Sequence, residues 1–83
     1  MNTLMKFTLD PSYHLNASWQ SKIRFALLHL SQANTAEISS YLHEYEPGRH
    51  VSEINAYVVW NILEMDDIVA LRVGDSTVRY SLK

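Results

Sequence analysis

Four side chains that could bind a metal ion lie close together in residues 43–50. They are His43, Glu44, Glu46 and His50. Imidazole and carboxylate groups are common ligands of divalent cations. Positions 43 and 50 are farther apart than the gap of roughly three to five residues between the paired histidines of a zinc site. We therefore expect a solvated loop here, without a metal ion.

The other residues that could do chemistry do not suggest an enzyme. The chain contains no Cys and only two Gly, so it has neither a thiolate nucleophile nor a Gly-rich phosphate loop. Its Ser and His residues lack a spacing that indicates a proton relay. A chain of 83 residues also has little room to enclose a substrate. We expect no enzymatic activity and no cofactor.

Composition indicates one small folded domain. Hydrophobic residues make up 47% of the chain, and Gly and Pro number two each, which is typical of a globular protein and not of a disordered one. The N-terminal residues lack the long apolar run of a signal peptide, and no stretch approaches the length of a membrane span. A cytoplasmic protein is expected.

Apolar residues at helical spacing predict the first two helices. The first helix begins near Asn16 or Ser18, either of which can cap it, and ends around Ser31. Its predicted core stripe is Trp19, Ile23, Leu27 and Leu30. The second helix begins with Thr35 as its cap and stops before Pro47. It directs Ile38 and Leu42 inward.

A third helix is predicted from a cap at Ser52 to about Met65. Its predicted inward residues are Ala56, Val59, Trp60 and Leu63. Its predicted outer or near-outer residues are Asn55, Tyr57, Val58, Asn61 and Ile62. Trp60, like Trp19 of the first helix, is therefore expected to be a core aromatic residue.

Residues 68–82 have the pattern of a two-stranded β-hairpin with Gly74-Asp75 as its turn. This turn predicts the pairs Val73–Ser76, Arg72–Thr77, Leu71–Val78, Ala70–Arg79 and Val69–Tyr80. Side chains alternate between the two faces of a strand. One face is therefore predicted to carry Val69, Leu71, Val73, Val78, Tyr80 and Leu82. The other is predicted to carry Arg72, Thr77, Arg79 and Ser81.

Three short segments resemble the winged helix-turn-helix transcription regulators, and within them the small regulators of fimbrial operons. The segments are TAEI (35–38), NAYVV (55–59) and LEMDDIV (63–69). The resemblance implies an α+β winged helix-turn-helix fold, in which three helices precede a two-stranded β-hairpin wing. Residues 16–83 would form this domain. Residues 1–15 would be an N-terminal arm with a possible short strand.

The same resemblance implies DNA binding, with helix 52–65 in the major groove and hairpin 68–82 on the backbone. In that arrangement Asn side chains can read adenine and apolar groups can touch a thymine methyl group. Cations and the helix N-terminus can hold phosphates. The candidate DNA-binding residues are Arg49, His50, Ser52, Asn55, Val58, Asn61, Arg72 and Arg79.

The net charge of −2 limits the expected affinity for double-stranded DNA, because few phosphates would be neutralised by one copy. A DNA-binding chain would therefore be expected to act as a dimer or with a protein partner. The alternative is a winged-helix interaction module, or an inhibitor of another protein, that does not bind DNA. The candidate interface for that alternative is Tyr57, Val58 and Ile62 on the third helix.

Overall fold

The computed structural model of this chain describes residues 10–74 and 77–83. Within them lie three helices, α1 (Trp19–Leu30), α2 (Thr35–His43) and α3 (Val51–Ile62). The strands are β1 (Gln32–Ala33), β2 (Ile68–Val73) and β3 (Thr77–Leu82). The predicted strand near residues 6–9 lies outside the described residues.

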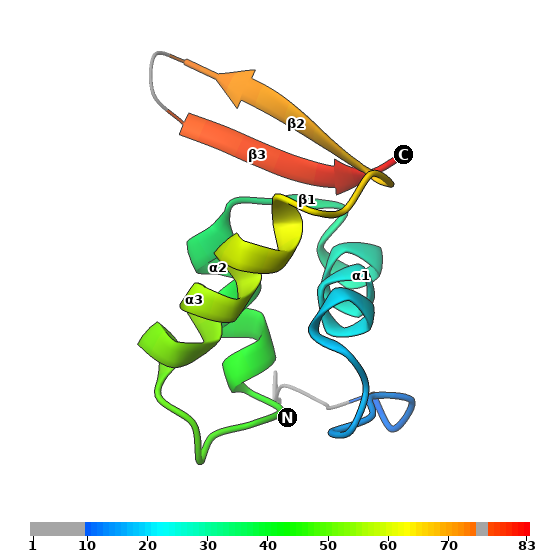
Figure 1. The fold of residues 1–83 in the computed structure, drawn as a ribbon, viewed down its shortest axis with the longest axis vertical. Helices are drawn as coiled ribbons and strands as arrows, with labels where there is room; N and C mark the ends of the chain where they lie inside the picture. Colours follow the sequence, from blue (N-terminus) through cyan, green and yellow to red (C-terminus); the bar gives the residue numbers. More distant parts are fainter. Residues whose placement is uncertain (1–9, 75–76) are drawn as a thin grey trace, which may run out of the picture.

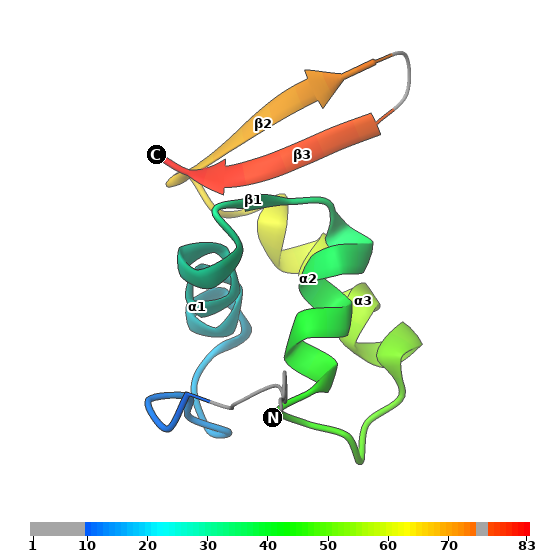
Figure 2. The same cartoon turned by 180° about the vertical axis from the view of Figure 1, so that it is seen from behind.

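The sheet lies across one end of the three helices (Figures 1 and 2). Its strand order is β1-β3-β2, and both pairings are antiparallel. The α+β class and the C-terminal hairpin are confirmed. The predicted count of two strands is wrong, because the two residues of β1 pair with the far side of β3, Gln32 with Ser81 and Ala33 with Tyr80. Such a short segment carries no alternation from which a strand can be predicted.

The helix ends differ by a few residues from those predicted. Ser18 caps α1, and its hydroxyl accepts a hydrogen bond from the backbone N–H of Ser21 at 3.1 Å. The cap of α2 is Asn34, which forms a reciprocal capping box with Glu37, so the prediction of Thr35 is wrong. Asn is the stronger N-cap residue of the two. His50 occupies the N-cap position of α3 in place of Ser52.

The face that α3 turns toward the core is not the predicted one. Ile54, Val58 and Ile62 are buried, whereas Trp60 is 69% exposed and Leu63 76% exposed. Ala56 and Val59 are also exposed. The buried residues follow one another at intervals of four, as one face of a helix requires.

An acidic residue of α3 gives a physical reason for this orientation. Glu53 precedes Ala56 by three residues and Trp60 by seven. Residues at these spacings lie on the same side of a helix. Burying the side that carries Trp60 would therefore also move the Glu53 carboxylate toward the core, where burying a charge is costly.

The hairpin forms, but its register is one residue away from the predicted one. The observed pairs are Ile68–Leu82, Val69–Ser81, Ala70–Tyr80, Leu71–Arg79, Arg72–Val78 and Val73–Thr77. β2 therefore ends at Val73 opposite Thr77, the first residue of β3, and Gly74 after it has a φ of +74°. The predicted partner Ser76 and the second turn residue Asp75 lie outside the described residues.

This shift exchanges the faces of β2. Directly paired residues project on the same side of a sheet, so Ile68 shares the helix-facing side with Tyr80 and Leu82. All three pack against the core. Leu71 and Val73 instead lie on the outer side and are exposed. Because apolar residues occupy both faces of β2, its sequence does not select one register.

A buried ion pair stabilises the end of the helical layer that lies opposite the sheet. The ammonium of Lys22 in α1 lies 2.6 Å from a carboxylate oxygen of Glu46, and both side chains are almost fully buried. Tyr13 donates a hydrogen bond to the same carboxylate oxygen, and Arg49 donates to the other at 2.6 Å. Glu46 therefore connects α1, the α2–α3 connection and the segment before α1. The expectation of a solvated Glu46 is wrong.

The protonation states of this cluster follow from its contacts. Burial disfavours the charged carboxylate of Glu46, but hydrogen bonds from Lys22, Tyr13 and Arg49 outweigh it and lower the pKa of Glu46. Burial and the neighbouring Glu46 raise the pKa of the Tyr13 hydroxyl, which therefore remains a donor. The Lys22 ammonium also lies 4.2 Å from the ring centroid of Trp19.

A second contact attaches residues 10–13 to the helices. Nδ1 of His29 lies 2.9 Å from the carbonyl oxygen of Phe25, and its Nε2 lies 3.0 Å from a carboxylate oxygen of Asp10. Only the doubly protonated imidazolium donates from both nitrogens. The hydrogen bond to Phe25, followed by that to Asp10, raises the pKa of His29 against the opposing effect of partial desolvation.

Replacing Glu46 should destabilise the protein strongly. We expect Glu46→Gln to lower the free energy of unfolding by about 3 kcal/mol, because Lys22 then remains buried without its counter-ion. The exposed neighbour Glu44 provides a control, and Glu44→Gln should change stability by less than about 0.5 kcal/mol. Urea unfolding at neutral pH measures both. Equal effects of the two substitutions would contradict the role assigned to Glu46.

The His29 contact predicts a pH dependence of stability. Because the folded-state pKa is raised, the stabilisation is fully present below the unfolded pKa of about 6.5 and is lost as pH rises through the folded value. The stability difference between the wild type and His29→Gln should therefore shrink from pH 5.5 to pH 8.5. Urea midpoints across this range measure the difference. A difference that stays constant or grows with pH would rule out the contact.

Candidate functional site

The asparagines expected to read bases from α3 are engaged within the domain. Asn55 is half-buried, and its side-chain oxygen accepts a hydrogen bond from the Ser39 hydroxyl at 2.9 Å, which links α3 to α2. The Asn61 amide donates to the backbone carbonyl of Tyr57 at 2.7 Å. Ser52 and His50 are exposed at the start of the helix. The structure therefore does not gather these residues into one outward polar strip.

The expected exposure of two apolar candidates is wrong. Val58 is fully buried and Ile62 is 7% exposed, and both belong to the hydrophobic core. Tyr57 remains partly exposed. Its ring stacks on that of Trp19, with a centroid distance of 4.7 Å and an interplanar angle of 8°. Tyr57 thus lies on the side of α3 that faces α1.

Several cations in the described part of the chain are paired with carboxylates. Arg49 contacts Glu46 and Glu53, and the hydrogen bond that its guanidinium donates to Glu46 raises the pKa of the guanidinium. Arg79 contacts Glu37 at 3.0 Å and the backbone oxygen of Gln32 at 3.0 Å. Lys22 is buried against Glu46, and Arg24 is paired with Asp67. To bind a phosphate, each must share or leave its present partner.

The two hairpin arginines also point to opposite sides of the sheet. Arg72 pairs with Val78 on the side that carries Tyr80, whereas Arg79 pairs with Leu71 on the outer side. The expectation that they share one face is therefore wrong. A single DNA backbone lying along the wing would not meet both side chains on one face.

Sequence reasoning missed the main exposed surface of α3. Ala56, Val59, Trp60 and Leu63 line an open hollow of about 440 Å³, and this set is called the α3 face below. Surface-exposed large apolar residues gathered in one patch are typical of interaction sites. The signal that could have identified them is the position of Glu53, three residues before Ala56 and seven before Trp60, which places the same side of the helix in solvent.

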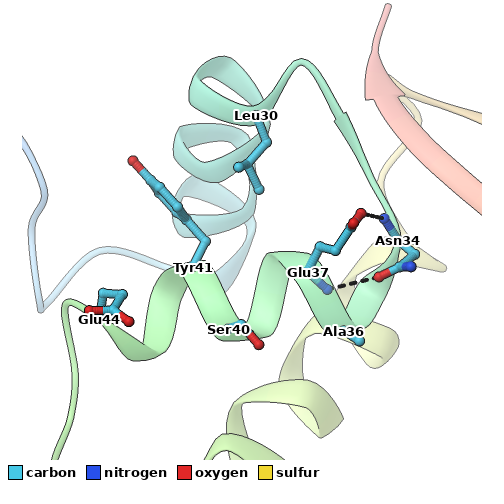
Figure 3. Close-up of a pocket in the computed structure, with 7 residues that line it drawn as sticks. All are labelled: Leu30, Asn34, Ala36, Glu37, Ser40, Tyr41 and Glu44. Atoms are coloured by element: carbon cyan, nitrogen blue, oxygen red, sulfur yellow. Dashed lines mark hydrogen bonds between the residues drawn. The ribbon is translucent and has the colours of Figure 1, made fainter. Parts of the chain in front are cut away.

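Two further hollows lie along α2. One is lined by Leu30, Asn34, Ala36, Glu37, Ser40, Tyr41 and Glu44 and has a volume of about 520 Å³ (Figure 3). The other, of about 400 Å³, lies between α2 and α3 and is lined by Thr35, Ala36, Ser39, Ser40, Val51, Ser52 and Asn55. Among the residues that the structure describes, neither Lys nor Arg lines any of the three hollows on these two helices.

Within residues 10–74 and 77–83, no three side chains of His, Cys, Asp or Glu lie together so as to hold a metal ion. Over the same ranges, none of the helices combines the length and apolar character needed to cross a membrane.

Comparison with known proteins finds no match for this chain among protein-family models, curated proteins or solved structures.

Proposed function

We propose that this chain is a small winged-helix interaction module that binds a partner protein through the α3 face and does not bind DNA. The order of elements supports a winged-helix fold: three helices, a short strand between the first two, and a C-terminal hairpin. The hairpin takes the place of the wing. Its pairing with β1 fixes it to the helices.

The observation that carries this proposal is the exposure of Trp60 and Leu63 on the α3 face. Trp is among the residue types most enriched at the dominant contributors to protein–protein affinity. Leu63 and Val59 extend its apolar surface. Transferring these side chains from water into a partner's pocket supplies the free energy of binding.

The charges near α3 favour a protein over a DNA duplex. Glu53 lies on the side of the helix that carries Trp60, and Glu64 and Asp66 follow its C-terminus. A helix inserted into the major groove would bring these carboxylates toward phosphates, and like charges repel. The hollows beside α3 add no Lys or Arg among the described residues.

The same carboxylates disfavour a second copy of this chain as the occupant. If two copies of α3 packed antiparallel across Trp60, Glu53 of each would approach the acidic end, Glu64 and Asp66, of the other. A parallel pairing would bring Glu53 against Glu53. A different protein, with an apolar pocket for Trp60, avoids both contacts.

Leu63→Glu should abolish binding of the partner. The matched control is Leu28→Glu on α1, because Leu28 is 71% exposed and Leu63 76%, so both substitutions add one charge at a similar exposed Leu. The tagged chain is expressed in its native host, and the amount of partner recovered with it is measured. Leu63→Glu should reduce the recovery of a specific partner at least tenfold, whereas Leu28→Glu should leave it unchanged. Circular dichroism confirms folding of both variants.

Fluorescence anisotropy with a duplex of mixed sequence tests the same proposal independently. We expect no binding that strengthens as salt is lowered, because four cations of the described residues, Lys22, Arg24, Arg49 and Arg79, are paired with carboxylates and are not available to release counterions. Salt-dependent duplex binding that survives Leu63→Glu, together with equal partner recovery by both variants, would overturn the proposal.

A further inference from the structure

One hollow, of about 520 Å³, lies on α2, and its lining shares no residue with the α3 face. Figure 3 shows Tyr41 and Leu30 facing each other across it, with Glu37 and Glu44 on the same helix as Tyr41. Leu30 comes from the end of α1, so the hollow spans the junction of two helices. Its lining is mainly apolar, and this surface is called the α2 groove below.

The apolar floor of the α2 groove is held in place from behind. The Tyr41 ring packs beside His29 and Phe25, with centroid distances of 5.8 and 6.3 Å, and its hydroxyl lies 3.3 Å from that of Tyr45. His29, beside the Tyr41 ring, contacts the Asp10 carboxylate. A floor packed against other rings loses little side-chain freedom when a ligand binds.

Two exposed carboxylates mark the rim of the groove. Glu37 and Glu44 are seven residues apart on α2, which corresponds to about 10.5 Å along the helix axis. The recorded contacts of Glu37, with the Asn34 backbone and with Arg79, both use Oε1. Within the described residues, Oε2 of Glu37 remains for a partner. The Glu44 side chain is exposed.

We propose that the α2 groove binds an amphipathic helix of a partner protein that carries two Lys or Arg residues about two turns apart. The apolar side of that helix would pack on Leu30 and Tyr41, and its cations would meet Glu37 and Glu44. A helix with basic residues at this spacing matches the two carboxylates, and its apolar side chains match the floor. This inference builds on the proposed interaction role but uses a surface separate from the α3 face.

A second copy of this chain does not satisfy the groove. In an antiparallel pairing of two α2 helices about the centre of the groove, Glu37 of each copy lies opposite Glu44 of the other. Four carboxylates would then share one interface, and among the described residues only Glu37 of each copy has a Lys or Arg, Arg79, paired with it. Like-charge contacts of this kind oppose association.

The test uses a fluorescein-labelled peptide of about 18 residues, long enough to form a helix on binding. Its sequence places Leu along one side and two Lys at the spacing of Glu37 and Glu44, and the control peptide has Glu in place of both Lys. We expect the Lys peptide to bind the full chain about tenfold more tightly than the Glu peptide at low salt. The peptide should shift the backbone NMR signals of Ala36, Ser40 and Tyr41.

Two sets of variants locate the contact. Glu37→Gln with Glu44→Gln should weaken the Lys peptide about tenfold, while Gln at position 37 preserves the capping box. Glu64→Gln with Asp66→Asn makes the same change in net charge beyond the groove and should have a much smaller effect. Ser40→Arg should block the groove by both size and charge. Leu63→Glu should leave the peptide affinity unchanged.

Equal weakening by the two double variants would show that the binding depends only on the net charge of the protein, and would overturn the inference. Failure of the Lys peptide to bind would also overturn it. The same holds if the peptide shifts the NMR signals of the α3 face, or if the signals of α2 shift with protein concentration alone. None of these results bears on the loss of the partner with Leu63→Glu, which tests the proposed function separately.

Discussion

The contact between Lys22 and Glu46 is the constraint on which the arrangement of the helices depends. The sheet covers one end of the helical layer, whereas the α2–α3 connection and the segment before α1 meet at the other end (Figures 1 and 2). At this second end, a single carboxylate receives hydrogen bonds or an ion pair from Lys22, Tyr13 and Arg49. Two buried charges are tolerated because each satisfies the other and the remaining oxygen has its own donor.

This cluster also determines what the surface of α3 presents. Arg49 precedes α3 by two residues and is held by Glu46, so the start of the helix is fixed relative to α1. Tyr57 then stacks on Trp19, on which the Lys22 ammonium also lies. With α3 held at its start and along this side, Ile54 and Val58 complete the core and Trp60 points outward. The arginine at the start of α3 thereby serves a structural contact, which weakens the case for phosphate binding.

The elements themselves were largely predictable, whereas the faces they turn inward were not. Three amphipathic segments and a turn marked by Gly74 are local features, and the helices and the hairpin appear where local features predict them. In α3 and β2, however, apolar residues occupy both sides, so periodicity fits two orientations equally well. Contacts between distant segments decide between them, such as those of Ile68 with the core or of Glu46 with Lys22.

For the candidate site too, the element was predictable but the side of it that is exposed was not. Val58 and Ile62 were predicted to be exposed on the third helix, but they are buried, and Val59, Trp60 and Leu63 are the exposed apolar residues. The position of Glu53 carries the missing information, because a carboxylate keeps its side of a helix in water unless it finds buried partners. Glu46 did find such partners, and these lie far away in the sequence.

The orientation of α3 is tested most directly by the fluorescence of single-tryptophan variants. Trp19→Phe leaves Trp60 as the sole reporter, and Trp60→Phe leaves Trp19, which is stacked on Tyr57. We expect Trp60 to emit at long wavelength and to be quenched readily by iodide, and Trp19 to be quenched much less. A Trp60 that emits at short wavelength and resists iodide would place it in the core and contradict the account of the α3 face.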